Sequence, residues 1–293
     1  MSSHTQTRER VSFQKRLGEL VRSNQKAIGY ILAAVAGYIF SGAIILERLS
    51  PFGVAFLAAV PFPFLLPGFL GAVLGYALSG SIQITMKYMA SALLVTTVHW
   101  LWGKKNRKTP LFACVSAAGA SLAITALIVV TGGGNVYQVI LGGCEALLSA
   151  GACYFFIRSR QAIGRLKESA FMNPTELSSI AITVVLMLVS LCRIQVEGLS
   201  LGRCLAVLLV LLAASAAREA GGSIAGVVAG LAMTLWDSSY VSLATGYSFG
   251  GLLAGVFAPF GRFGIACAFI IGNGIAAIVA GAQGETLMAL AEV

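Results

Sequence analysis

Apolar residues fill this chain almost without interruption from Ala27 to Gly281. The widest polar gaps, at Trp102–Thr109 and Arg158–Pro174, separate runs close to the roughly 20 apolar residues that a helix needs to cross a bilayer. Lipid offers the backbone no hydrogen-bond partners, so such runs are stable there as helices. The pattern predicts an all-α, polytopic transmembrane helical bundle. The expected spans are 27–46, 83–102, 109–131, 135–157, 176–193, 201–217, 221–236, 240–258 and 263–281.

The segment 51–80, between the first two spans, is interrupted by prolines. Pro61, Pro63 and Pro67 argue against one straight helix there, because proline lacks a backbone donor and its ring clashes with the preceding turn. We expect a broken helix pair, formed either by two short tilted spans or by re-entrant half-helices. With this pair the bundle has about nine to eleven membrane segments.

The two ends of the chain differ from the membrane domain expected over 27–293. Residues 1–26 form a basic, cytoplasmic amino terminus in which Phe13 and Leu17 share a helical face. This pattern predicts an amphipathic helix on the anionic inner leaflet, or equally a solvated lead-in to the first span. At the other end, 285–293 begins a new helix-forming run and stops, so we expect a longer natural chain with a truncated last span here.

Composition and charge support a membrane location. The chain is 58% hydrophobic and 11% charged, whereas soluble domains carry about 25% charged residues. The net charge of +9 lies in short clusters between spans, which follows the positive-inside rule and argues against nucleic-acid binding. We therefore expect a multi-pass plasma-membrane protein with a cytoplasmic amino terminus. The basic residues that set this topology are Lys104, Lys105, Arg107, Lys108, Arg158, Arg160, Arg165 and Lys167.

Glycines recur at helical spacing in three segments. The stretches 221–229 and 250–258 share the pattern Gly-Gly-x-x-Ala-Gly-Val-x-Ala. Such faces let helix backbones approach closely within lipid. Packing within one chain is the favoured interpretation, and a protomer–protomer interface or a substrate-lining face is the alternative. The helix-packing glycines are Gly71, Gly75, Gly222, Gly226, Gly230, Gly251 and Gly255.

Glu145 is the ionisable residue nearest the middle of an expected span, where charge is costly and often functional. It could donate a hydrogen bond, couple to protons, or pair with a basic side chain. Lys87 and His99 are expected near helix ends, where they can reach the interface. The six cysteines lack metal-ligand spacing, and no catalytic or phosphate-binding motif occurs. We expect no catalytic residue, metal or cofactor in this chain.

Several motifs resemble the membrane domain of the stage II sporulation protein E (SpoIIE) family. The segment Glu47–Phe56, with the sequence ERLSPFGVAF, closes the first span as the opening of that domain does. The glycine-rich Gly221–Gly230 and Leu243–Gly255 are similar to its later spans, and Glu145 to a carboxylate in the corresponding helix. The resemblance extends over about 27–293, and the order and spacing of the motifs carry it.

The resemblance implies a ten-span domain with both ends cytoplasmic. In the family this domain precedes a cytosolic oligomerisation region and a PPM-type serine/threonine phosphatase that uses Mn or Mg. It also implies dephosphorylation of an anti-sigma-factor antagonist, forespore sigma-factor activation, and assembly with FtsZ at the polar septum. This chain is then a membrane-anchoring and self-association domain. The alternative is a small-solute transporter or transporter subunit, and a sensor with an outer binding region ranks last.

Overall fold

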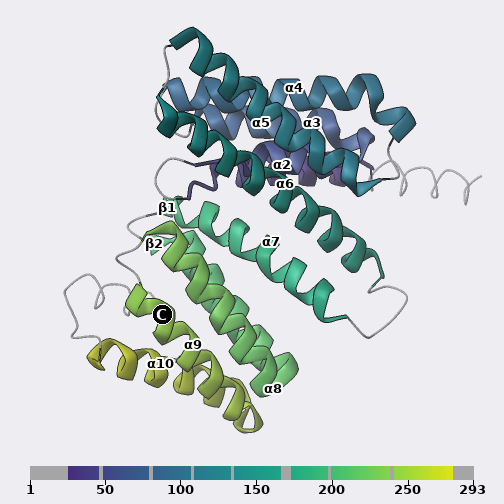
Figure 1. The fold of residues 1–293 in the computed structure, drawn as a ribbon. Helices are drawn as coiled ribbons and strands as arrows, with labels where there is room; N and C mark the ends of the chain where they lie inside the picture. The colour runs from purple at the N-terminus through teal and green to yellow at the C-terminus, as the bar shows by residue number, and fades with distance from the viewer. Residues whose placement is uncertain are drawn as a thin grey trace, which may run out of the picture.

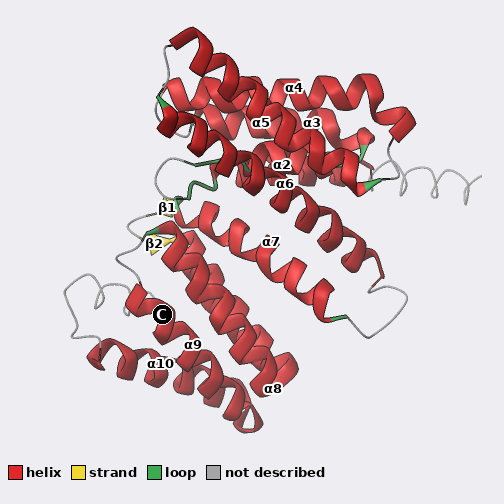
Figure 2. Ribbon diagram, in the orientation of Figure 1, coloured by secondary structure: helices red, strands yellow, loops and turns green. Residues whose placement is uncertain are grey.

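The computed structural model describes 26–45, 49–78, 82–106, 109–132, 135–165, 173–196, 199–237 and 241–279, which are almost entirely helical (Figures 1 and 2). A first helix spans Lys26–Gly42. It is followed by α2 (Phe52–Ala59), η1 (Phe62–Phe64), α3 (Leu65–Ala77), α4 (Ile82–Asn106), α5 (Pro110–Gly132) and α6 (Val136–Arg165). The second part contains α7 (Pro174–Cys192), β1 (Gln195–Val196), β2 (Leu199–Ser200), α8 (Leu201–Trp236), α9 (Val241–Val256), η3 (Ala258–Phe260) and α10 (Gly261–Val279).

Helices cover every expected span within the described residues, so the helical class is confirmed. By length and composition, five helices could cross a membrane: α5, α6, α7, α8 and the combined Ala258–Val279. Two apolar helices, Lys26–Gly42 and Phe62–Ala77, are shorter. The sequence did not predict the two-stranded antiparallel pair β1–β2, in which Val196 pairs with Leu199.

The element α8 is two antiparallel helical halves rather than one rod. Its backbone leaves helical geometry at Ala217 and at Arg218, where φ is 52°. Arg203 near the start lies 5.9 Å from the ring centroid of Trp236 at the end. A straight helix of 36 residues would hold its ends about 54 Å apart, so the chain must reverse at Ala217–Arg218. The two halves correspond to the expected spans 201–217 and 221–236.

The segment 51–80 is broken after α2. Val60 has extended geometry (φ −74°, ψ 139°), as expected for a residue before proline, and Pro61 then starts the short turn η1. The resulting helices α2 and α3 have 8 and 13 residues. At 1.5 Å per residue, α2 is only about 12 Å long, far short of a bilayer crossing.

Two hydrophobic cores organise the molecule, and α7 contributes to both. The first core lies among α2–α6 and the second among α7–α10, the upper and lower groups of helices in Figure 1. Leu186 of α7 belongs to the first core, whereas Val185, Leu188 and Val189 belong to the second. Helix α7 is therefore a shared wall between two bundles.

The predicted glycine faces lie where helices of this same chain meet. A Cβ added at any of these glycines would collide with atoms of another helical element of this chain. On α8 and α9 the contacts are Gly222 with Gly251, Gly226 with Tyr247, Gly230 with Ala244, and Gly255 with Arg218. In the first bundle they are Gly71 with Ala34, and Gly75 with Tyr38 and Ser41.

Several expected features lie outside the described residues. They include the amphipathic segment within 1–25, the final run 285–293, and Glu47, Arg48, Arg107, Lys108 and Lys167. Lys104 and Lys105 fall within α4, but their side chains are not described.

We predict that Gly226→Ala destabilises the fold, because its Cβ would meet the Tyr247 carbonyl oxygen rather than a flexible side chain. Overpacking of this kind costs about 1–3 kcal/mol. Gly119→Ala on α5 is the matched control, since a Cβ there meets nothing within 4 Å. Thermal unfolding in detergent should show a lower midpoint for Gly226→Ala only. Equal midpoints for the two variants would contradict the packing described here.

Candidate functional site

Glu145 forms a buried ion pair with Lys87. The Glu145 side chain on α6 is 2% exposed, and its Oε2 lies 2.5 Å from Nζ of Lys87 on α4. Lys87, which the sequence places near a helix end with the reach to approach the interface, has its side chain 18% exposed and paired with this carboxylate. An unpaired carboxylate in this interior would be costly, so the pair offsets the desolvation of Glu145.

Tyr88 extends the ion pair into a chain of hydrogen bonds. Its hydroxyl donates to Oε1 of Glu145 at 2.9 Å and accepts from the backbone N–H of Ser50 at 3.0 Å. The hydroxyl of Tyr76 donates to the Ser50 carbonyl oxygen at 2.9 Å. The rings of Tyr76 and Tyr88 stack with centroids 5.5 Å apart. One loop and three helices, α3, α4 and α6, thus meet at a single polar network.

The loop before α2 is shaped to hold this network. A two-way backbone bridge between Ile45 and Leu49 closes the turn, and the Ser50 hydroxyl donates to the Ser41 carbonyl oxygen at 2.8 Å. A Cβ at Gly53 would lie 2.5 Å from the Tyr76 hydroxyl, so only glycine leaves that group its place. Ser50 and Gly53 belong to the ERLSPFGVAF segment, which therefore has a structural purpose: it delivers backbone groups to Tyr76 and Tyr88.

Two further buried hydroxyls lie on the α5–α6 interface beside Glu145. Ser149 is one helical turn after Glu145, and Thr125 of α5 packs against Gly142, one turn before it. Neither hydroxyl oxygen has a hydrogen-bond partner among the described residues. This side of the carboxylate is thus polar but only partly satisfied, unlike the side that faces Tyr88.

The network can bind and orient through charge and hydrogen bonds, but nothing in it suggests metal chemistry. Within the described part of the chain, no group of three His, Cys, Asp or Glu side chains lies close enough to hold a metal ion. A lone carboxylate paired with an ammonium group and a phenol is typical of a structural tie or a proton-sensitive site.

The basic residues at the end of α6 have separate partners. Arg158 donates to the Tyr154 hydroxyl at 3.1 Å, and Arg160 donates to the Ala59 carbonyl oxygen at the same distance. Arg165 pairs with Glu176 at 2.7 Å and so ties the end of α6 to the first turn of α7. The sequence pattern had indicated only that this cluster sets the orientation of the chain in the membrane.

Comparison with known proteins identifies the family. The long apolar helices are those of an α-helical membrane protein. The sequence model described as "SpoIIE, N-terminal domain" matches residues 1–293, the whole chain, and the chain belongs to that family. Neither the curated proteins nor the solved structures give a match. Family membership and apolar helices together indicate a membrane-anchoring role in a SpoIIE-like protein.

We predict strong coupling between Lys87 and Glu145 in stability. Lys87→Met or Glu145→Gln alone leaves an uncompensated buried group, and breaking a buried ion pair typically costs about 3–5 kcal/mol. The double variant should lose less than the sum of the two, because no unpaired charge remains. Unfolding midpoints of the four proteins in detergent measure this coupling. Glu219→Gln, at an exposed carboxylate, is the control with little expected change. If the stability losses of the two single variants simply add up in the double variant, the ion pair makes no contribution to stability.

Proposed function

We propose that this domain anchors a SpoIIE-like serine/threonine phosphatase in the plasma membrane and gathers it at the polar septum. Membership of the SpoIIE N-terminal domain family over the whole chain is the observation that carries the proposal. The chain is multi-pass in this proposal, with its amino terminus and the basic connectors around 104–108 and 158–167 in the cytoplasm. The attached phosphatase is cytosolic, binds Mn or Mg, and activates the forespore sigma factor.

Confinement to a membrane patch supplies the physical advantage of such an anchor. A tethered module meets its neighbours at an effective concentration set by the patch rather than by the cell volume. Weak contacts among cytosolic modules, or with FtsZ and an anti-sigma-factor antagonist, then become populated. The anchor contributes position and density, and the chemistry belongs to the module it carries.

Self-association in this proposal uses surfaces other than the glycine faces. Those faces are already occupied by helices of the same chain, as at Gly222 and Gly251. By packing the helices of one chain closely, the glycine faces make the bundle rigid and keep its outer surface in a fixed shape. Rigid presentation matters because two anchors can pair repeatedly only if their lipid-facing helices keep one arrangement.

The buried network supports the anchor function by fixing the broken segment. Ser50 lies just before α2, a helix too short to cross a membrane alone. Tyr76 of α3 bonds to Ser50, and Ser50 is held through Tyr88 to Glu145. A short helix in a bundle needs such ties, since its own apolar surface is small.

We predict that residues 1–293 fused to a fluorescent protein accumulate at the polar septum of a sporulating, endospore-forming bacterium. The same reporter on an unrelated multi-pass membrane domain should spread evenly through the membrane. Septal-to-lateral fluorescence ratios measure the difference. Stepwise photobleaching of the purified fusion in nanodiscs reports its self-association. An even membrane distribution and a single bleaching step would contradict septal gathering and self-association respectively.

A small-solute transporter is the second candidate, and the buried Lys87–Glu145 pair is the feature that favours it. Transport through this site needs a wet path to Glu145. The two cavities described for this chain are lined by other residues. For the anchor, we predict that proteoliposomes holding the wild type and Glu145→Gln take up solute no faster than empty vesicles. Uptake that depends on Glu145 would replace the anchor proposal with a transport function.

A further inference from the structure

A cavity of about 190 Å³ lies between the starts of α3 and α5 and the last turns of α2, α4 and α6. It is bordered by Ala59 at the end of α2 and Pro110 at the start of α5. His99 and Arg160 reach it from within the last two turns of α4 and α6. In the proposed topology the carboxyl ends of α4 and α6 face the cytoplasm, so the cavity near these ends is assigned to the cytoplasmic headgroup region.

Polar side chains, with Arg160 as the charged donor, line the described part of this cavity. Its described polar side chains are Arg160, His99, Thr109 and Gln161, and no Asp or Glu is among the described lining residues. Within this described lining, the charge of Arg160 has no carboxylate to compensate it. Such a site favours an anion over a cation or a neutral solute.

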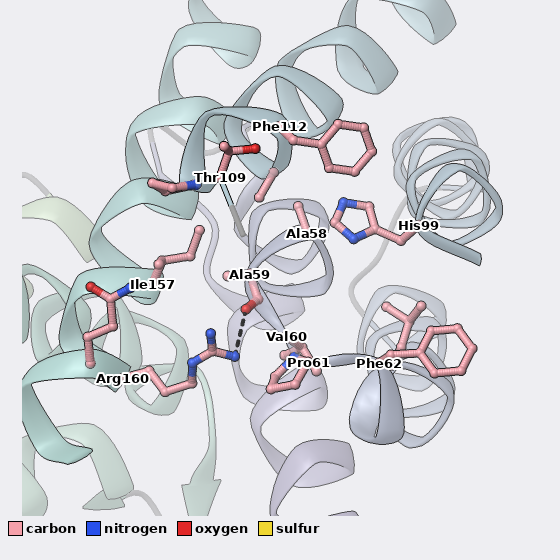
Figure 3. Close-up of a pocket in the computed structure, with 14 residues that line it drawn as sticks. Ala58, Ala59, Val60, Pro61, Phe62, His99, Thr109, Phe112, Ile157 and Arg160 are labelled. Atoms are coloured by element: carbon pink, nitrogen blue, oxygen red, sulfur yellow. Dashed lines mark hydrogen bonds between the residues drawn. The ribbon is translucent and has the colours of Figure 1, made fainter. Parts of the chain in front are cut away.

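Arg160 is held over the cavity by its own hydrogen bond. One guanidinium nitrogen donates to the Ala59 carbonyl oxygen at 3.1 Å, at the end of α2 (Figure 3). A guanidinium carries five N–H donors in a rigid fork, and this bond uses one of them. Arginine pairs with phosphate through two parallel hydrogen bonds, so a fixed guanidinium is well suited to a phosphate oxygen pair.

The opposite wall is also fixed. Ser116 donates its hydroxyl hydrogen to the Ala113 carbonyl oxygen, so it accepts from Nε2 of His99 across 2.8 Å. The His99 ring also packs against Phe112 with centroids 5.3 Å apart. Figure 3 shows His99 and Arg160 on opposite sides of the end of α2. The cavity thus has ordered walls, and the amino end of α5 adds its partial positive charge.

The surroundings of the cavity suit a lipid better than a free ion. Next in sequence to its lining residues are Leu66, Trp100 and Leu111, whose side chains are 67%, 64% and 73% exposed. Large apolar side chains exposed beside a cationic cavity can contact acyl chains while the phosphate lies inside. Basic pockets between membrane helices are a known place for anionic headgroups.

We propose that this cavity binds the phosphate of an anionic phospholipid headgroup, with Arg160 as its principal ligand. Binding would give the domain a preference for membrane regions rich in anionic lipid. The inference requires a membrane location but not the link to a phosphatase or to the septum. Free phosphate shares the same chemistry, and the experiment below separates the two sources.

Native mass spectrometry of the delipidated 293-residue chain in detergent tests the proposal. Phosphatidylglycerol, phosphatidylcholine and inorganic phosphate are the three probes. The wild type should bind a first phosphatidylglycerol about tenfold more tightly than phosphatidylcholine, and Arg160→Gln should remove most of that difference. Arg158→Gln is the matched control. It removes the same charge only two residues from Arg160, and the Arg158 side chain bonds to Tyr154 rather than lining the cavity.

Arg160→Lys keeps the positive charge but loses the forked guanidinium donors. Its preference for phosphatidylglycerol over phosphatidylcholine should therefore fall between those of the wild type and Arg160→Gln. It also serves as the folded variant if Arg160→Gln fails to give a native circular dichroism spectrum and elution volume. Equal losses in Arg160→Gln and Arg158→Gln would overturn the site in favour of general surface charge. Displacement of phosphatidylglycerol by millimolar inorganic phosphate would overturn the lipid assignment in favour of a free-anion site.

Discussion

The buried carboxylate of Glu145 is the constraint on which the first bundle depends. A charge in an apolar interior must be paired and hydrogen-bonded, and here α4 and the loop before α2 together meet that requirement. Lys87 supplies the opposite charge, Tyr88 the hydrogen bond, and Ser50 the backbone group that orders Tyr88. The arrangement of α4, α6 and the loop before α2 is therefore specified by a polar requirement rather than by apolar packing alone.

In the second bundle, close approach of helix backbones determines how the helices are arranged. Without a hydrophobic force between helices in lipid, contact area and small side chains determine which helices associate. The second half of α8 lies against α9 through glycines on both sides, and Cys192 of α7 contacts Met233 on that same half. The first bundle thus combines glycine contacts with a buried ion pair and hydrogen bonds, whereas the second depends mainly on shape.

The sequence predicted the helices well, because the length and apolar character of each run are enough to indicate a helix buried in lipid or protein. Pro61 predicted the break before η1, and the gap between the expected spans 201–217 and 221–236 predicted the reversal within α8. The pair β1–β2 was missed because two-residue strands leave no periodicity to detect. The glycine repeat predicted close approach but could not distinguish a neighbouring helix of the same chain from one of another protomer.

The partners of Glu145 could not be predicted, since they lie far away along the chain. Tyr88 is 57 residues from Glu145, and Ser50 is a further 38 from Tyr88. Nothing in the pattern of α4 distinguishes a lysine turned inward from one that extends to the interface. The segment Glu47–Phe56 was the best available indication of these partners. Its Ser-Pro-Phe-Gly sequence next to a membrane helix suggests a turn whose backbone groups bind other side chains.

The position of α7 has a mechanical consequence. The closest packing between the two bundles runs through this helix, with Leu186 on one side and Leu188 on the other. Because neighbouring residues of α7 are held in different interiors, rotation of this helix about its long axis would disturb the packing of both. The shared helix therefore locks the two bundles in one relative orientation.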